Sequence, residues 1–266
     1  MPQRQSVPAT IRKDEMRDMN LGLNGKRALV TGASSGLGLG AAKALVEEGV
    51  RVIVASRSED KLSQAVATLG ANASYVVADL SNPATAKELP ARAASLLGGL
   101  DILICNSGGP RAGGFFDVEI EDYRRAIDAN MLSSIELAKA AVPFMEESNW
   151  GRIIAITSLW VRQPSQNLIL SNTARTGLTA FIKTMAGAVA SKNITANTIQ
   201  PGFHLTERFR ELNGDNSARV ASQIPARSLG SPDDFGAVVA FLCSEQAKYV
   251  TGTSLPVDGG LYLGLM

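Results

Sequence analysis

The stretch RALVTGASSGLG, residues 27–38, joins two different sequence patterns near the start of the chain. Residues 27–31 form a β-rich run that predicts a strand, whereas residues 41–48 predict a helix. Between them, glycines let the chain turn tightly and let backbone N–H groups approach a pyrophosphate without an intervening Cβ. The start of the helix adds unpaired donors and a partial positive charge. The segment therefore predicts a phosphate-binding loop; a glycine-rich turn without a ligand is the alternative.

The rest of the chain continues this alternation of strand and helix patterns. Further strands are predicted at 50–56, 74–78, 101–105, 152–157, 194–199 and 254–257, and further helices at 58–69, 83–97, 120–145, 170–190 and 233–243. Several strands are continuous apolar runs, as expected when helices cover both faces of a parallel sheet. We expect an α/β fold: a single-domain, Rossmann-like, doubly wound parallel sheet of about seven strands with helices on both faces. A barrel of eight βα units is the alternative, but it needs another strand.

Composition excludes several classes of function. With 26 Lys and Arg against 25 Asp and Glu, the formal net charge is +1, which gives no reason to expect nucleic acid or an anionic membrane as a partner. Two cysteines, Cys105 and Cys243, rule out a disulfide scaffold, and both are predicted to pack in the interior. With a single histidine as well, no metal site is expected. No apolar run approaches the ~20 residues of a membrane span.

The polar N-terminal segment differs from the rest of the chain. Residues 1–24 predict a flexible arm, with an untied terminus or a start codon assigned too early as the alternatives, and residues 25–266 predict one dinucleotide-binding catalytic domain. The N-terminus lacks the apolar core of a signal peptide, so we expect a cytoplasmic protein.

Further motifs occur in a fixed order along the chain. They are Asp79-Leu80 after the third predicted strand, Asn106-Ser107-Gly108-Gly109 after the fourth, Asn130, Ser158 after the fifth, Pro201-Gly202 with Thr206, Thr251-Gly252, and Val257-Asp258-Gly259-Gly260. Together with the G-x-x-x-G-x-G spacing of residues 32–38, this set resembles the short-chain dehydrogenase/reductase family from residue 26 onward. The resemblance implies a nicotinamide cofactor, a small-molecule substrate, and a homodimer or homotetramer that pairs through the two long helices.

The end of the second predicted strand bears on which cofactor binds. An NAD enzyme usually places an acid there for the ribose 2′-OH, but this chain has Ser56 followed by Arg57. Because a guanidinium pairs with a 2′-phosphate, we expect NADP(H) over NAD(H); a surface arginine without a partner is the alternative. The resemblance implies a cofactor site made of Gly32, Ser34, Ser35, Gly36, Leu37, Gly38, Ser56, Arg57, Asp79, Leu80, Asn106, Ser107, Gly108, Arg175, Pro201, Gly202 and Thr206. Within it, Asp79 and Leu80 would lie against the adenine.

The catalytic positions depart from the family pattern. Asn130 and Ser158 match family residues that support a proton relay and orient the substrate carbonyl. The family's Tyr-x-x-x-Lys pair is absent: aligning residues 176–186 puts Ser171 at the Tyr position and Arg175 at the Lys position. A Ser hydroxyl is a far weaker acid than a phenol of pKa ~10, whereas Arg175 can still bind ribose hydroxyls. General acid catalysis typically contributes ~10²–10⁴-fold, so its loss need not abolish turnover.

Three replacements for the missing proton donor are open. They are His204, for which a solvated loop histidine is the favoured interpretation, Tyr262 in the C-terminal tail, and a water chain through Asn130 and Ser158. We expect an oxidoreductase that acts on a carbonyl or alcohol, and the resemblance includes enzymes that reduce 3-oxoacyl compounds or similar ketones. The alternative is a nucleotide-binding protein without turnover, acting as a sensor or an assembly partner. Phe115-Phe116 and Trp160 either line an apolar substrate pocket or serve packing alone.

Overall fold

The computed structural model describes residues 20–265. Most of the predicted arm therefore lies outside the described residues. Its last residues join the folded domain: Leu23 is buried, and the Glu245 amide donates to the Leu21 carbonyl at 3.1 Å.

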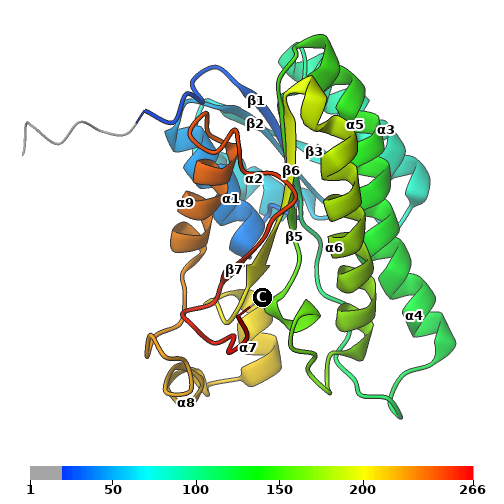
Figure 1. Ribbon diagram of the computed structural model, residues 1–266, viewed down its shortest axis with the longest axis vertical. Coiled ribbons are helices and arrows are strands. Elements are labelled where there is room, and N and C mark those ends of the chain that lie inside the picture. The colour runs from blue at the N-terminus through cyan, green and yellow to red at the C-terminus, as the bar shows by residue number, and fades with distance from the viewer. Residues whose placement is uncertain (1–19, 266) are drawn as a thin grey trace, which may run out of the picture.

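Seven strands form one parallel sheet in the order β3-β2-β1-β4-β5-β6-β7 (Figure 1). The strands are β1 (Arg27–Thr31), β2 (Arg51–Ser56), β3 (Ala73–Val77), β4 (Ile102–Cys105), β5 (Gly151–Ile156), β6 (Ile194–Pro201) and β7 (Ser254–Val257). The helices are α1 (Gly36–Glu47), α2 (Glu59–Leu69), α3 (Pro83–Leu97), α4 (Ile120–Ile127), α5 (Ser133–Glu147), α6 (Ile169–Val189), α7 (Glu207–Asn213), α8 (Ser217–Ala221) and α9 (Pro232–Cys243). The predicted doubly wound parallel sheet is confirmed.

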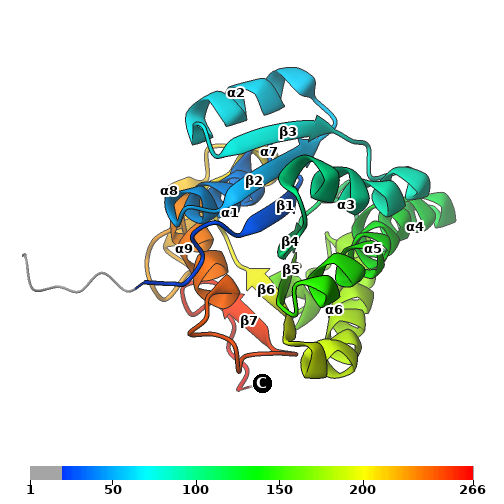
Figure 2. The ribbon, with the colours of Figure 1, turned by 90° about the horizontal axis from the view of Figure 1, so that it is seen from above.

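Helices cover both faces of the sheet (Figure 2). Alternate residues of a strand point to opposite faces, so Leu29 of β1 packs into the core beneath α3, α5 and α6. Its neighbours Ala28 and Val30 pack into the second core, beneath α1 and α9. Both cores require apolar side chains, which explains why the strands are continuous apolar runs. Cys105 and Cys243 are buried in these cores, as predicted.

The helix predicted at 120–145 is interrupted. Between α4 and α5 the chain forms a π-helical turn, Asp128–Leu132, which contains Asn130. Such turns occur mostly as short interruptions of α-helices and frequently at functional sites. Sequence periodicity could not show the interruption, because one extra residue in one turn leaves the apolar pattern on either side intact. The helices α7 and α8 were not predicted either.

The helices α1 and α9 pack at close range through two glycines. A Cβ on Gly40 would overlap the Pro232 carbonyl oxygen, and a Cβ on Gly236 would overlap the Gly40 carbonyl oxygen. No larger residue fits this contact without separating the two helices. Since α1 begins at the predicted phosphate loop, the contact also fixes the position of that loop.

His204 ties the segment after β6 to the start of α9. It forms a parallel β-bridge with Gly230, its ring lies edge-on to Phe235 at a centroid distance of 5.3 Å, and only 5% of the residue is exposed. The expectation of a solvated histidine is therefore wrong, because the chain between β6 and α9 folds back over the ring. Burial lowers the pKa of His204 below its ordinary value of 6.5.

We expect Gly40→Ala to lower the free energy of unfolding by about 1–3 kcal/mol, because the added methyl forces α1 and α9 apart. Chemical denaturation would measure the change. Gly187→Ala, in the interior of α6, is the matched control: its Cβ would meet nothing within 4 Å, so helix propensity should leave stability unchanged or slightly raised. Equal losses in both variants would contradict the proposed contact.

The buried His204 predicts a pH dependence of stability. Above about pH 6.5 the ring is neutral in both the folded and the unfolded chain, so it contributes nothing there. As the pH falls below that value, His204 binds a proton in the unfolded chain but stays neutral in the folded chain. The free energy of unfolding therefore falls. The fall in unfolding free energy between pH 7 and pH 5 should therefore be smaller in His204→Gln. An unchanged slope in that variant would contradict the assignment.

Candidate active site

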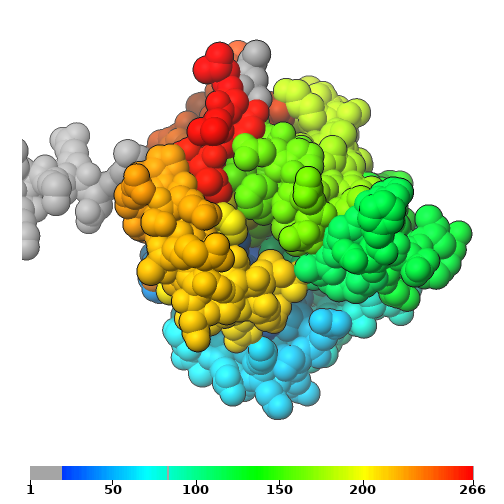
Figure 3. All heavy atoms as spheres, turned by 90° about the horizontal axis from the view of Figure 1, so that it is seen from below, coloured from blue at the N-terminus to red at the C-terminus, as the bar shows by residue number. Residues whose placement is uncertain are grey.

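The carboxyl ends of the strands border two adjoining cavities, on the face viewed in Figure 3. One, of about 990 Å³, extends from the loop after β1 past the ends of β2 and β3 to α4. The other, of about 520 Å³, extends from the same loop past the end of β5 to α6 and α7. They share Gly32, Ser35, residues 106–110, Glu207 and Arg208. We call them the first and the second cavity.

The predicted phosphate loop is held against the end of β4. The Thr31 hydroxyl accepts from the Asn106 amide at 3.0 Å and donates to the Asn106 carbonyl at 2.8 Å, while Asn106 Nδ2 donates to the Gly32 carbonyl at 2.9 Å. Gly32 has φ +57°, and a Cβ there would lie 2.7 Å from the Asn106 carbonyl oxygen. A Cβ on Gly38 would overlap the Gly32 carbonyl, so Gly38 serves packing.

The other end of this loop is open to a ligand. The α1 N-cap, Ser35, makes no side-chain capping bond, so the first amides of α1 have no partner from that side chain. Both Ser35 and the backbone at Gly36 border the second cavity, and Ser34 and Ser35 border the first. Amides at a helix start that lack a capping partner suit an anionic ligand such as a pyrophosphate.

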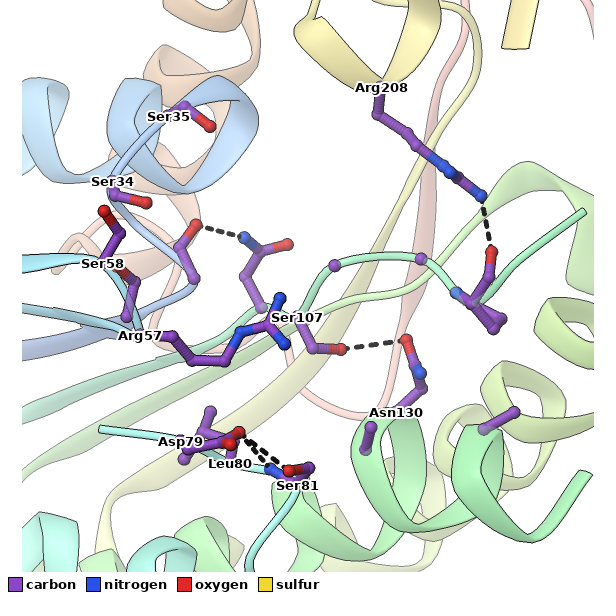
Figure 4. Close-up of a pocket in the computed structure, with 18 of the residues that line it drawn as sticks. Ser34, Ser35, Arg57, Ser58, Asp79, Leu80, Ser81, Ser107, Asn130 and Arg208 are labelled. Carbon is purple, nitrogen blue, oxygen red and sulfur yellow. Dashed lines mark hydrogen bonds between the residues drawn. The ribbon is translucent and has the colours of Figure 1, made fainter. Parts of the chain in front are cut away.

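The end of β2 places a cation in the first cavity and a buried, unsatisfied hydroxyl at its wall. Ser56 Oγ is buried without a hydrogen-bond partner among the described residues. Arg57 follows it, and its side chain extends into the cavity (Figure 4). Across the cavity, Asp79 accepts from the Ser81 amide at 3.0 Å and from its hydroxyl at 2.9 Å, and these bonds hold the pKa of Asp79 below its ordinary value. The Ser56 hydroxyl and the Arg57 guanidinium fit a phosphorylated ribose, because both groups can donate hydrogen bonds to a phosphate.

The second cavity contains three of the four predicted catalytic residues. Ser158 follows β5, where its hydroxyl accepts from the Trp160 amide at 3.2 Å, and Ser171 and Arg175 lie one turn apart on α6. Asn130 borders the first cavity and reaches the others through Arg175, whose Nη2 donates to Asn130 Oδ1 at 3.2 Å. The Ser107 hydroxyl also donates to that oxygen, at 3.1 Å. The fold thus brings all four residues to one region.

Arg175 is a buried cation that is held by neutral acceptors. Besides Asn130, its guanidinium donates to the Ile156 carbonyl at 2.7 Å and to the Ser107 carbonyl at 3.1 Å. Burial lowers the pKa of Arg175 to about 10, and the nearby charge of Arg208 contributes to the shift. The group therefore stays charged at neutral pH and cannot act as a proton donor there.

The other predicted site residues differ in whether they border a cavity. All predicted cofactor residues except Gly38 border one or both cavities. His204 borders the second cavity, whereas Tyr262 borders neither. The Tyr262 amide donates to the Asp258 carboxylate at 2.7 Å, and the Arg162 guanidinium lies over the Tyr262 ring. Within this chain, Tyr262 is therefore not placed to donate a proton in either cavity.

The aromatic residues that the sequence left open also divide. Trp160 borders the second cavity and packs edge-on against Phe203 at a centroid distance of 5.6 Å. Phe115 and Phe116 border neither cavity and are 73% and 95% exposed, so they neither line a pocket nor anchor α4 by burial.

Sequence analysis missed the part of the second cavity that α7 supplies. Arg208, Phe209 and Leu212 of α7 border it. The signal was Thr206 followed three residues later by an aromatic side chain: the Thr206 hydroxyl accepts from the Phe209 amide at 3.1 Å and caps α7.

Over the described residues, no group of histidine, cysteine, aspartate and glutamate could hold a metal ion. Nor does that part of the chain contain a helix that is long and apolar enough to cross a membrane.

Comparisons with known proteins agree with this geometry. The family model described as enoyl-(acyl carrier protein) reductase matches residues 32–262. The chain is 35% identical to the 3-oxoacyl-[acyl-carrier-protein] reductase FabG of Escherichia coli, over 91% of this chain and all of that protein. It is 34% identical to dehydrogenase/reductase SDR family member 4 of Homo sapiens, over 90% of this chain and 88% of that protein.

Two solved structures share the whole fold. YwfH, described as an NADPH-dependent reductase involved in bacilysin biosynthesis, superposes with a TM-score of 0.86 at 29% identity and covers 90% of this chain and all of that one. L-sorbose reductase of Gluconobacter frateurii, solved with NADPH and L-sorbose, gives 0.87 at 30% identity over 93% of this chain and all of that one. On this evidence the chain belongs to the short-chain dehydrogenase/reductase family of NAD(P)-dependent oxidoreductases.

Proposed function

We propose that the protein is an NADP(H)-dependent oxidoreductase that interconverts a carbonyl compound and its alcohol. The single observation that carries the proposal is the paired geometry of the two cavities, which share the loop after β1. Arg57 borders the first cavity, and the start of α1 and Ser158 border the second. A dinucleotide laid across this loop would reach both cavities. The NADPH-linked relatives support the same cofactor.

The residues that would hold the cofactor follow from their positions. The amides at the start of α1 would bind the pyrophosphate, and Arg57 with Ser56 Oγ would bind a 2′-phosphate. Arg175 would bind the ribose hydroxyls nearest the reacting carbon. The bound nicotinamide supplies or accepts the hydride.

The protein's own groups would act on the substrate oxygen. The Ser158 hydroxyl would donate a hydrogen bond to it, and the fixed charge of Arg175 would favour negative charge that develops nearby. We propose that Ser171 and Arg175 stand in place of the family's tyrosine and lysine. Since a serine hydroxyl is a weak acid, the proton would come from a water chain through Asn130 and Ser158, with Arg175 holding the Asn130 side chain in place.

A second function is favoured by one specific observation. The sequence has no tyrosine between Tyr123 and Tyr249, and Tyr262 borders neither cavity. A protein that binds NADP(H) without turnover, as a sensor or an assembly partner, would need the groups that hold the cofactor but no proton donor beside Ser158.

We also propose the setting in which the protein works. A small-molecule substrate fits a cavity of about 520 Å³. A cytoplasmic homodimer or homotetramer, paired through α5 and α6, agrees with the resemblance to the family. Exposed Leu132, at the junction of α4 and α5, adds apolar surface for such pairing.

Arg57→Ala should weaken NADPH binding by about 10- to 100-fold, because a hydrogen bond to a charged group contributes roughly 1.5–3 kcal/mol. NADH has no 2′-phosphate, so its affinity should change little. Isothermal titration calorimetry with both cofactors would measure this, with Arg92→Ala on the exposed face of α3 as the control. Tighter binding of NADH than NADPH in the wild type, unaltered by Arg57→Ala, would refute the cofactor proposal.

Two changes at the second cavity test turnover. Ser158→Ala should reduce kcat on carbonyl substrates by about 10²–10³-fold, the effect of removing one donor to a developing oxyanion. The double variant Ser171→Tyr/Arg175→Lys should raise kcat by about 10-fold or more, because it supplies a phenol as the acid. Absorbance at 340 nm over a panel of carbonyl compounds and alcohols measures both. Tight NADPH binding with no turnover in any variant would instead favour the sensor.

A further inference from the structure

The second cavity has an excess of positive charge beside the position proposed for the substrate. Its charged lining residues are Arg175, Arg208 and Glu207. The Glu207 carboxylate is committed elsewhere: it pairs with Lys61 Nζ at 3.1 Å, and Lys61 borders the first cavity only. Two guanidinium groups therefore face this space with no carboxylate of the cavity wall paired to either.

Arg208 extends from α7 across the junction of the two cavities (Figure 4). Its Nη2 donates to the Pro110 carbonyl at 2.5 Å, and its Nη1 donates to Glu211, which borders only the first cavity, at 3.1 Å. A Cβ on Gly109 would lie 3.4 Å from Arg208 Nε, so the guanidinium passes close over the loop after β4. The Arg208 side chain is long and charged, and one of its hydrogen bonds goes to the neutral Pro110 carbonyl. A charged acceptor on a ligand can replace that carbonyl.

The two guanidinium groups also repel each other. The charge of Arg208 is close enough to disfavour the charged form of Arg175, which already has no acidic partner in its hydrogen bonds. Arg175 is buried, and a like charge held beside a buried charge costs free energy. An anionic group bound between them would relieve that cost.

Aromatic side chains form one part of the cavity wall. Trp160, Phe203 and Phe209 form a continuous edge-to-face series, with the last pair at a centroid distance of 6.0 Å, and Leu212 extends it. Aromatic walls of this kind bind an apolar body, while the few polar groups set its orientation. The cavity is thus divided between a cationic side and an apolar side.

We infer that the substrate is an anionic oxo compound, whose carboxylate or phosphate oxygens bind Arg208 while its carbonyl faces Ser158 and its apolar body packs on Trp160 and Phe203. The inference rests on the proposed function and names its substrate class. Arg208 is thereby a specificity-determining residue. A neutral acyl thioester or an uncharged sugar would leave Arg175 without an anion and Arg208 with Glu211 alone.

The test compares acids with their neutral esters. The probes are 2-oxo-4-phenylbutanoate and 4-oxo-4-phenylbutanoate, each with its methyl ester, and 2-oxo-2-phenylethyl phosphate as the phosphate arm. We expect kcat/KM for one anionic probe to exceed that of its neutral counterpart, and the acid-to-ester ratio to fall by roughly 10- to 100-fold in Arg208→Gln. Arg208→Lys should restore part of the ratio, because it keeps the charge and loses the planar fork.

Arg210→Gln is the matched control, since Arg210 lies on α7 two residues away and borders neither cavity. Equal kcat/KM for acids and esters in the wild type, or a ratio unchanged by Arg208→Gln, would overturn the inference while the proposed function stands. If NADPH binds but neither these probes nor any compound of the carbonyl and alcohol panel reacts, the proposed function fails instead. Equilibrium titration of the NADPH-loaded protein with the same acids and esters then tests the inference. The acid should bind more tightly than its ester, and the ratio of the two dissociation constants should shrink in Arg208→Gln.

Discussion

The hydrogen bonds that join Thr31, Gly32 and Asn106 hold the rest of the site in place. They connect the ends of β1 and β4, the neighbouring strands from which the chain departs to opposite faces of the sheet. Where neighbouring strands send their connections to opposite faces, a crevice opens at the carboxyl edge. Because one loop borders both cavities, a shift of a fraction of an ångström there would displace the cofactor site and the substrate site together.

Arg175 connects the two cavities electrostatically. It takes its acceptors from the end of β5, from the loop after β4 and from the π-helical turn, so three segments far apart in sequence fix one guanidinium. That arrangement keeps a permanent charge beside the second cavity, where we propose that Arg175 takes the place of the family's lysine. A permanent charge can hold ribose hydroxyls and favour an anion, but it cannot relay a proton. We therefore propose that Ser158 donates the hydrogen bond to the substrate oxygen and that water supplies the proton.

The sequence predicted most of the framework, and the reasons are local. The RALVTGASSGLG segment combines a strand, a turn and a helix start within twelve residues, and each strand of the sheet repeats an apolar pattern that needs no distant partner to be recognised. Many residues that border the cavities could be predicted because they come directly after a strand, at the carboxyl edge of the sheet. Several features escaped prediction: the interruption at Asp128–Leu132, the helices α7 and α8, and the burial of His204. Each depends on how a segment packs against another part of the chain.

By itself, the amino-acid sequence determined the order of the strands and of most helices, the glycine-rich loop after β1, the pair Ser56-Arg57, and the absence of a tyrosine between Tyr123 and Tyr249. Tertiary structure alone decided that Arg208 and Arg175 face one cavity, that Glu207 pairs away from it with Lys61, and that His204 is enclosed. The physical reason is that strand and helix patterns arise from interactions between residues close in sequence. The charge and solvent exposure of a cavity instead depend on side chains that only the folded chain brings together.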